Sequence, residues 1–196
     1  MHAYRGRYPL DHTLPWDSRK DGFLQYAVVY KDCIEFLMEH YEKKPPSHDY
    51  GMAPVLFLLR HYVELQLKGI LISCRYDLKD LNHNIAELYK KTMKFVIEIY
   101  GRENVGNPDA EVEKFLLALG NFSQKGEAFR YPESKDGTPF SEKFKASDIW
   151  FYESITDFSK LRPLIKNVID NIEGFGILLQ ELDHAKNEME REMDSE

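Results

Sequence analysis

Three charged residues recur at a spacing of four in an otherwise apolar stretch, residues 52–74. A helix would stack Arg60, Glu64 and Lys68 on one face, where the carboxylate can pair with both cations. One interpretation is a solvated, salt-bridged edge. The other is the wall of a cleft, in which Arg60 and Lys68 bind phosphate, Glu64 orients an arginine and the neighbouring His61 acts as the catalytic acid or base. Both interpretations stay open on the residues alone.

A second candidate is the string Phe129-Arg130-Tyr131-Pro132, which lies in a polar segment with several glycines and prolines. Phe129 and Tyr131 would anchor this segment and hold the Arg130 guanidinium in place. A fixed guanidinium suits bidentate contact with phosphate or carboxylate. Alternatively, Arg130 pairs with a carboxylate such as Glu64 and pins the loop. If both features form one site, this loop must fold back over the 52–74 helix.

The remaining chemistry-bearing residues give weaker signals. We expect His83 to be a hydrogen-bonding residue at a helix end, because it comes directly before Asn84 and a new apolar period. The histidines and Cys33 and Cys74 show no spacing typical of a metal site, so neither a metal nor another cofactor is expected. Phosphate-binding loops and nucleophile elbows are also absent from the sequence.

Helical periods account for most of the chain and predict an all-α fold. Apolar residues at steps of three and four predict about five helices. The first is ended by Lys43 and Lys44 and then Pro45-Pro46; the third has Asn84 as its cap and Gly101 as its stop. The predicted segments are helices at about 23–43, 52–74, 85–100, 107–120 and 161–182, with a long loop over 121–148.

The domain organisation follows from the same pattern. We predict a single domain over residues 1–184 and a frayed or disordered acidic tail over 185–196. The stripe of the last helix contains Gly174 and Gly176, which weaken a helix unless a close backbone approach compensates. That approach, within one chain or between two, leads us to expect a homodimer.

Composition excludes several classes of protein. The 196 residues carry a net charge of -7, which argues against broad, charge-driven binding of nucleic acid but leaves room for a local basic site. The longest apolar run is far too short to cross a bilayer, so we expect no membrane association. Two cysteines outside any metal-like pair fit a reducing cytoplasm.

Three segments in order resemble the HEPN superfamily, the higher-eukaryote and prokaryote nucleotide-binding domains. They are Phe57–Lys68 (FLLRHYVELQLK), Leu81–Leu88 (LNHNIAEL) and Phe129–Pro132 (FRYP). The last two are separated by a long stretch, and the similarity covers roughly residues 20–180. The resemblance implies an up-and-down helical bundle, commonly homodimeric, that binds RNA or nucleotide phosphate. It also implies a setting in bacterial phage defence or a toxin–antitoxin pair, with an antitoxin or defence protein as partner.

Many members of that superfamily are metal-independent ribonucleases with the signature Arg-x4-6-His on a late helix. None of the helices predicted here carries that signature, and the formal match of Arg7 to His12 flanks Pro9 in the terminal segment. Ribonuclease activity therefore stays an open expectation, with His61 as its candidate acid or base. The alternative is a non-catalytic, dimeric protein-interaction module.

Overall fold

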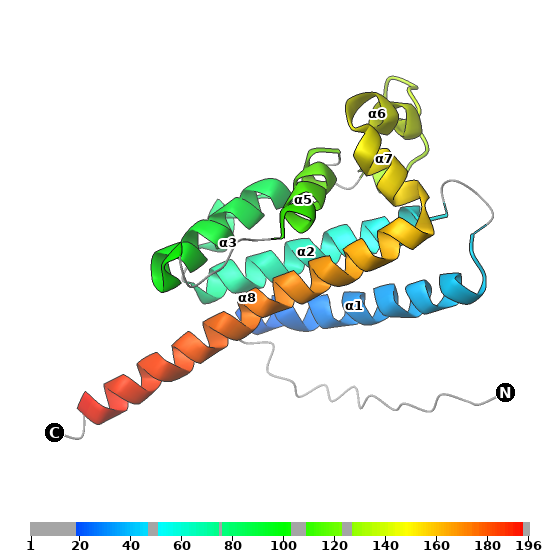
Figure 1. The fold of residues 1–196 in the computed structure, drawn as a ribbon. Helices are drawn as coiled ribbons and strands as arrows, with labels where there is room; N and C mark the ends of the chain where they lie inside the picture. Colours follow the sequence, from blue (N-terminus) through cyan, green and yellow to red (C-terminus); the bar gives the residue numbers. More distant parts are fainter. Residues whose placement is uncertain (1–18, 47–50, 75, 103–108, 123–126, 194–196) are drawn as a thin grey trace.

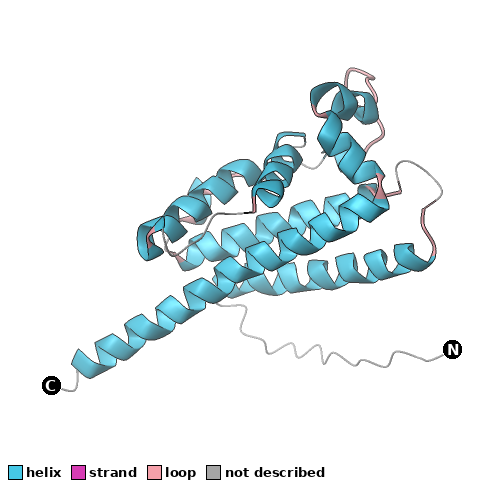
Figure 2. Ribbon diagram, in the orientation of Figure 1, coloured by secondary structure: helices cyan, strands magenta, loops and turns pink. Residues whose placement is uncertain are grey.

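The computed structural model describes residues 19–46, 51–74, 76–102, 109–122 and 127–193 of the chain. These residues form seven α-helices and two 3-10 turns, and no β-strand occurs among them (Figure 2). The only extended pairing within these ranges is a lone bridge between Glu133 and Pro139. The prediction of an all-α fold is confirmed.

Helix α2 (Ala53–Ser73) lies at the centre of the described structure. It packs against α1 (Arg19–Lys43), α3 (Ile85–Tyr100) and α8 (Phe158–Met193). Figure 1 shows α1, α2 and α8 running alongside one another, with α3 and α5 (Ala110–Phe122) on the side of α2 away from α1. Two adjacent apolar stripes on α2 explain this position, because one helix can be covered on several sides only where most of its surface is apolar.

Several predicted helix ends are confirmed. Helix α1 ends at Lys43, before the two prolines. The Asn84 side chain accepts from the backbone N–H groups of Ala86 (3.0 Å) and Glu87 (3.3 Å) and so caps α3. Gly101 ends that helix with a φ of 74°, a conformation that glycine adopts without steric strain.

Helix α5 differs from its prediction at both ends. The expected start, Asn107-Pro108, lies outside the described residues, and Asp109 caps the helix by accepting from the N–H of Glu111 at 2.9 Å. The predicted stop at Gly120 is wrong, because the helix continues to Phe122. A Cβ at Gly120 would lie 2.8 Å from the backbone N of Ala86, so this glycine permits close packing of α5 on the start of α3.

The predicted loop over 121–148 is wrong in part. Its described portion contains a 3-10 turn, η2 (Glu127–Phe129), and a short helix, α6 (Phe140–Ser147). A further helix, α7 (Ile149–Thr156), precedes α8, which starts at Phe158, three residues before the first residue of its predicted apolar stripe, Leu161. Helices of eight residues are too short to display a clear period, which is why the sequence pattern missed them.

The C-terminal part of α8 extends beyond the other helices (Figure 1). Its backbone is helical to Met193, and the fraying expected for residues 185–196 stays a prediction. Neither Gly174 nor Gly176 has a described atom within 4 Å of the position a Cβ would take. Within the described ranges, no helix has the length and apolar character that a membrane span requires.

Candidate functional site

Glu64 lies at the centre of a charged cluster on α2. Its Oε2 accepts from Arg60 Nη1 at 3.0 Å, and its Oε1 accepts from Lys68 Nζ at 2.8 Å. All three residues are buried, with exposed fractions of 4–5%. The pairing expected from the spacing of four is therefore present, but the cluster is buried and not a solvated edge.

The cluster also ties α2 to the start of α3. Arg60 Nη2 donates to the backbone carbonyl of His83 at 2.8 Å. The His83 Nδ1 lies 2.6 Å from Glu64 Oε1, while 70% of the His83 side chain is exposed. The prediction of His83 as a hydrogen-bonding residue at a helix end is confirmed. Its contact with Glu64 also fixes the ring, so His83 is a second acid–base candidate beside His61.

The electrostatics of the cluster keep Glu64 ionised. Burial alone would raise the pKa of Glu64, but the hydrogen bonds and charges of Lys68 and His83 outweigh burial and hold it below its usual value. With Arg60 and Lys68 positive and Glu64 negative, the three side chains carry a net charge of +1. This buried excess of positive charge lies on the face of α2 that the start of α3 approaches.

His61 lies on a different side of α2, facing α1. Its ring packs edge-on against Tyr30 of α1, with the two ring centroids 4.6 Å apart. Burial lowers the pKa of His61 below 6.5, assisted by the charges of Arg60 and Lys68 and opposed by Glu64. A neutral imidazole is therefore favoured near pH 7, and it can accept a proton.

The segment that carries Arg130 folds back onto α2, as expected for a single site. The turn η2 packs against α2. The Arg130 guanidinium carbon lies 5.9 Å from the centroid of the Phe57 ring and 5.6 Å from that of Tyr131. Phe129 is buried, whereas Tyr131 is 57% exposed and contacts the guanidinium.

Phe57 connects the two candidate features. It lies three residues before Arg60 on α2, so Arg130 packs one helical turn from the charged cluster. The three hydrogen-bond partners of Glu64 are Arg60, Lys68 and His83, so the alternative in which Arg130 pairs with Glu64 is wrong. Arg130 is an exposed residue that is held by aromatic rings.

The spacing of residues did not predict the contact between Glu64 and His83. They lie nineteen positions apart, and no sequence period relates a residue on one helix to the turn before the next. A weak signal was the Leu81-Asn82-His83-Asn84 string, because its cap places His83 at the turn that begins α3. In the part of the chain that the structure describes, no cluster of three or more His, Cys, Asp or Glu side chains has an arrangement suited to a metal ion.

The arrangement suits recognition of an anion. It combines an exposed, ring-supported guanidinium with a buried excess positive charge and a solvent-exposed histidine held by a carboxylate. Comparison of the chain with protein-family models, with curated proteins and with solved structures finds no match. The functional interpretation therefore rests on the residues and their geometry.

Proposed function

We propose that this chain is a HEPN-like domain that binds RNA or a nucleotide through phosphate, with Arg130 as the direct contact. The observation that supports the proposal most is the exposed Arg130 guanidinium beside the rings of Phe57 and Tyr131. Rings on which a guanidinium packs restrict its conformational freedom. Less entropy is then lost when phosphate binds.

Arg60 and Lys68 act mainly through their charge in this proposal. Both are buried and donate to Glu64, so their excess charge raises the local potential while Arg130 meets the ligand. Glu64 orients the two cations and His83. The net charge of -7 on the whole chain favours such a local site over a broad basic surface.

Proton transfer to or from RNA is an open part of the proposal. His61 is the candidate acid or base, and His83 joins it because its ring is both exposed and oriented. We expect weak or no cleavage, because the Arg-x4-6-His signature is missing from the helices. Metal-independent cleavage that His61→Ala abolishes would contradict this expectation.

The cellular setting follows from the same resemblance. We place the chain in the cytoplasm, in bacterial phage defence or a toxin–antitoxin pair, as a homodimer with an antitoxin or defence protein as partner. The genes next to its own are the observation that tests this setting.

Binding of a fluorescein-labelled single-stranded RNA, followed by anisotropy, tests the phosphate contact. Arg130→Ala is expected to weaken binding about tenfold or more, a loss of about 1.4 kcal/mol. Lys90→Ala is the matched control, because Lys90 is an exposed cation on α3. Thermal unfolding of Arg130→Ala should match that of the wild type. Equal binding by wild type and Arg130→Ala would overturn the proposal.

A second candidate function, the non-catalytic interaction module, is favoured by the outer face of α1. Tyr26, Val29 and Phe36 are 52%, 59% and 70% exposed. With the exposed Cys33 they follow steps of three and four, the spacing of a coiled-coil seam. Exposed large apolar side chains along one helix are typical of protein contact surfaces.

The two candidate functions respond to different variants. Phe36→Glu should abolish self-association or partner binding if α1 is the contact surface, and should leave RNA binding unchanged. Gln25→Glu, an exposed position on the same helix, controls for added negative charge. Light scattering measures self-association, and a Phe36→Glu protein with the mass of wild type would count against this surface between copies.

A further inference from the structure

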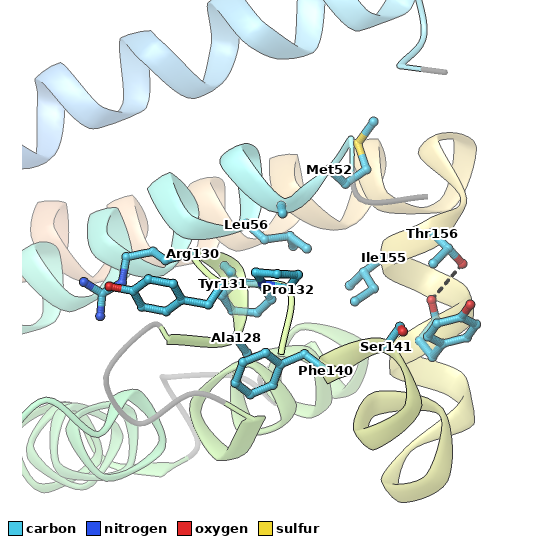
Figure 3. Close-up of a pocket in the computed structure, with 13 residues that line it drawn as sticks. Met52, Leu56, Ala128, Arg130, Tyr131, Pro132, Phe140, Ser141, Ile155 and Thr156 are labelled. Atoms are coloured by element: carbon cyan, nitrogen blue, oxygen red, sulfur yellow. Dashed lines mark hydrogen bonds between the residues drawn. The ribbon is translucent and has the colours of Figure 1, made fainter. Parts of the chain in front are cut away.

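A cavity of about 350 Å³ adjoins Arg130 at one end of the described structure. It lies between the start of α2, the segment after η2, and helices α6 and α7 (Figure 3). Cavities of a few hundred cubic ångströms with mainly apolar walls are the usual size for small ligands.

The walls of this cavity are apolar and aromatic. Leu56 of α2 and Ile155 of α7 are almost fully buried, and both line it. Four aromatic residues also line it: Phe129, Tyr131, Phe140 and Tyr152. Flat apolar and aromatic surfaces favour a planar ring, because the ring can stack on them and leave contact with water.

The polar groups lie toward the two ends. Figure 3 shows Arg130 at one end and Ser141 and Thr156 at the other, with Leu56 and Ile155 between them. The Thr156 hydroxyl donates to the carbonyl of Tyr152 at 2.9 Å, and its oxygen retains acceptor capacity. An occupant with an anionic group near Arg130 and a donor at its other end would match this distribution.

Backbone hydrogen bonds fix the segment that forms one wall. The N–H of Phe140 donates to the carbonyl of Pro132 at 3.1 Å and so closes the loop between them. Within that loop Asp136 accepts from the N–H of Thr138 and from Lys143 Nζ, both at 3.1 Å. Tyr131 and Phe140 are thereby held on opposite ends of a closed loop, so the cavity is formed before any ligand binds.

We infer that this cavity binds a planar aromatic ring whose acidic substituent contacts Arg130. The inference rests on the proposed function in one respect, since both place an anionic group of the ligand at Arg130. Two sources have this chemistry: a nucleotide, with its base in the cavity and its phosphate at Arg130, and a free aromatic acid. The ring packs against Tyr131 and Phe140, and Thr156 meets its far edge.

Calorimetric titration of the full chain with four probes tests the inference. Adenosine monophosphate and 4-hydroxybenzoate carry both a ring and an acid, ribose 5-phosphate lacks the aromatic ring, and adenosine lacks the acid. We expect at least one of the two ring-bearing acids, adenosine monophosphate or 4-hydroxybenzoate, to bind about tenfold more tightly than ribose 5-phosphate and adenosine. Ring-bearing acids that bind no more tightly than these two would overturn the inference.

Two variants locate the ring. Ala53→Phe places a large side chain at the cavity wall, and Phe140→Leu removes an aromatic surface; each should weaken the ring-bearing acid about tenfold. Ala146→Phe, an exposed position on α6, is the matched control. Should Ala53→Phe fail to fold, as judged by thermal unfolding, Phe140→Leu decides. Unchanged binding in the folded variants would overturn the inference.

The outcomes separate this inference from the proposed function. Phosphate probes that bind through Arg130 with no gain from a ring would leave the proposed function standing and end the inference. Binding of 4-hydroxybenzoate alone, lost in both Arg130→Ala and Phe140→Leu, would support the cavity while contradicting the nucleotide proposal.

Discussion

The two carboxylate oxygens of Glu64 contact three side chains, so among the described residues Glu64 is the one whose replacement we expect to affect stability most. Its bonds to Arg60, Lys68 and His83 join three positions of α2 to the turn before α3. A buried pair of this kind adds little net stability over an apolar substitute, because desolvation offsets the Coulomb attraction. Loss of the carboxylate is different, since Arg60 and Lys68 then stay buried after losing this counter-charge.

Replacement of this carboxylate is the first prediction. Glu64→Gln leaves Arg60 and Lys68 buried without their counter-charge and should lower the free energy of unfolding by about 3–5 kcal/mol. Glu98→Gln is the control, because Glu98 also pairs with a lysine at a spacing of four, Lys94, but on an exposed surface. The control should change stability by less than about 0.5 kcal/mol. Equal urea midpoints for the two variants would show that the cluster is not structurally important.

The depressed pKa of Glu64 gives a second prediction, a dependence of stability on pH. Its folded pKa lies below 4.5, the value expected for the unfolded chain, so its ionisation contributes stability that is fully present above pH 4.5. That contribution is lost as the pH falls through the folded pKa. The difference in stability between wild type and Glu64→Gln should therefore shrink from pH 6 toward pH 3.

Denaturant unfolding at several pH values measures this difference. The depressed pKa values of Asp136 and Asp157 affect both proteins equally and cancel in the comparison. A difference that stays constant down to pH 3 would mean that the ionisation of Glu64 is not what stabilises the cluster.

At the scale of elements, glycines on two helices have opposite roles that sequence alone did not distinguish. Gly120 of α5 faces the backbone of Ala86, whereas Gly174 of α8 faces open space within the described chain. Gly120→Ala should destabilise the fold by about 1–3 kcal/mol, because the added methyl group forces α3 and α5 apart. At a concentration too low for dimers, Gly174→Ala should stabilise the single chain by about 0.5–1 kcal/mol through reduced backbone entropy.

Thermal unfolding of the two variants measures whether each substitution raises or lowers stability. A gain of stability in Gly120→Ala would show that α5 can move away from α3 at little cost. A loss in Gly174→Ala that grows with protein concentration would indicate that this glycine contacts a second chain.

How far the sequence predicts an element depends on its length and its capping residues. Asn84, Gly101 and the prolines after Lys43 act within one turn of the chain, so the ends of α1 and α3 were predictable. Helix α6 has eight residues and depends on tertiary packing, which no local signal encodes. The site divides in the same way. The pairing of Arg60, Glu64 and Lys68 follows from helical spacing, whereas the contacts of Glu64 with His83 and of Arg130 with Phe57 join separate elements.

At the scale of the whole molecule, two apolar or small-residue surfaces are exposed in the part of the chain that the structure describes. One is the outer face of α1, which carries Phe36. The other is the part of α8 around Gly174, Gly176 and Ile177, where the helix extends past its neighbours and Ile177 is 58% exposed. No described segment of the chain approaches the two glycines, and we propose that a second chain makes the close approach there.

The last prediction is a homodimer formed through α8. Light scattering at micromolar concentration should give a mass of about 46 kDa, twice the chain mass of 23.1 kDa. Gly174→Leu combined with Gly176→Leu should shift the mass toward 23.1 kDa, because two leucines hold the helix backbones apart. Gly22→Leu is the control, since Gly22 likewise has no described atom within 4 Å of its Cβ position but lies on α1. A wild-type mass near that of one chain would contradict the dimer. A dimer that survives the double variant but dissociates in Phe36→Glu would place the contact on α1 instead.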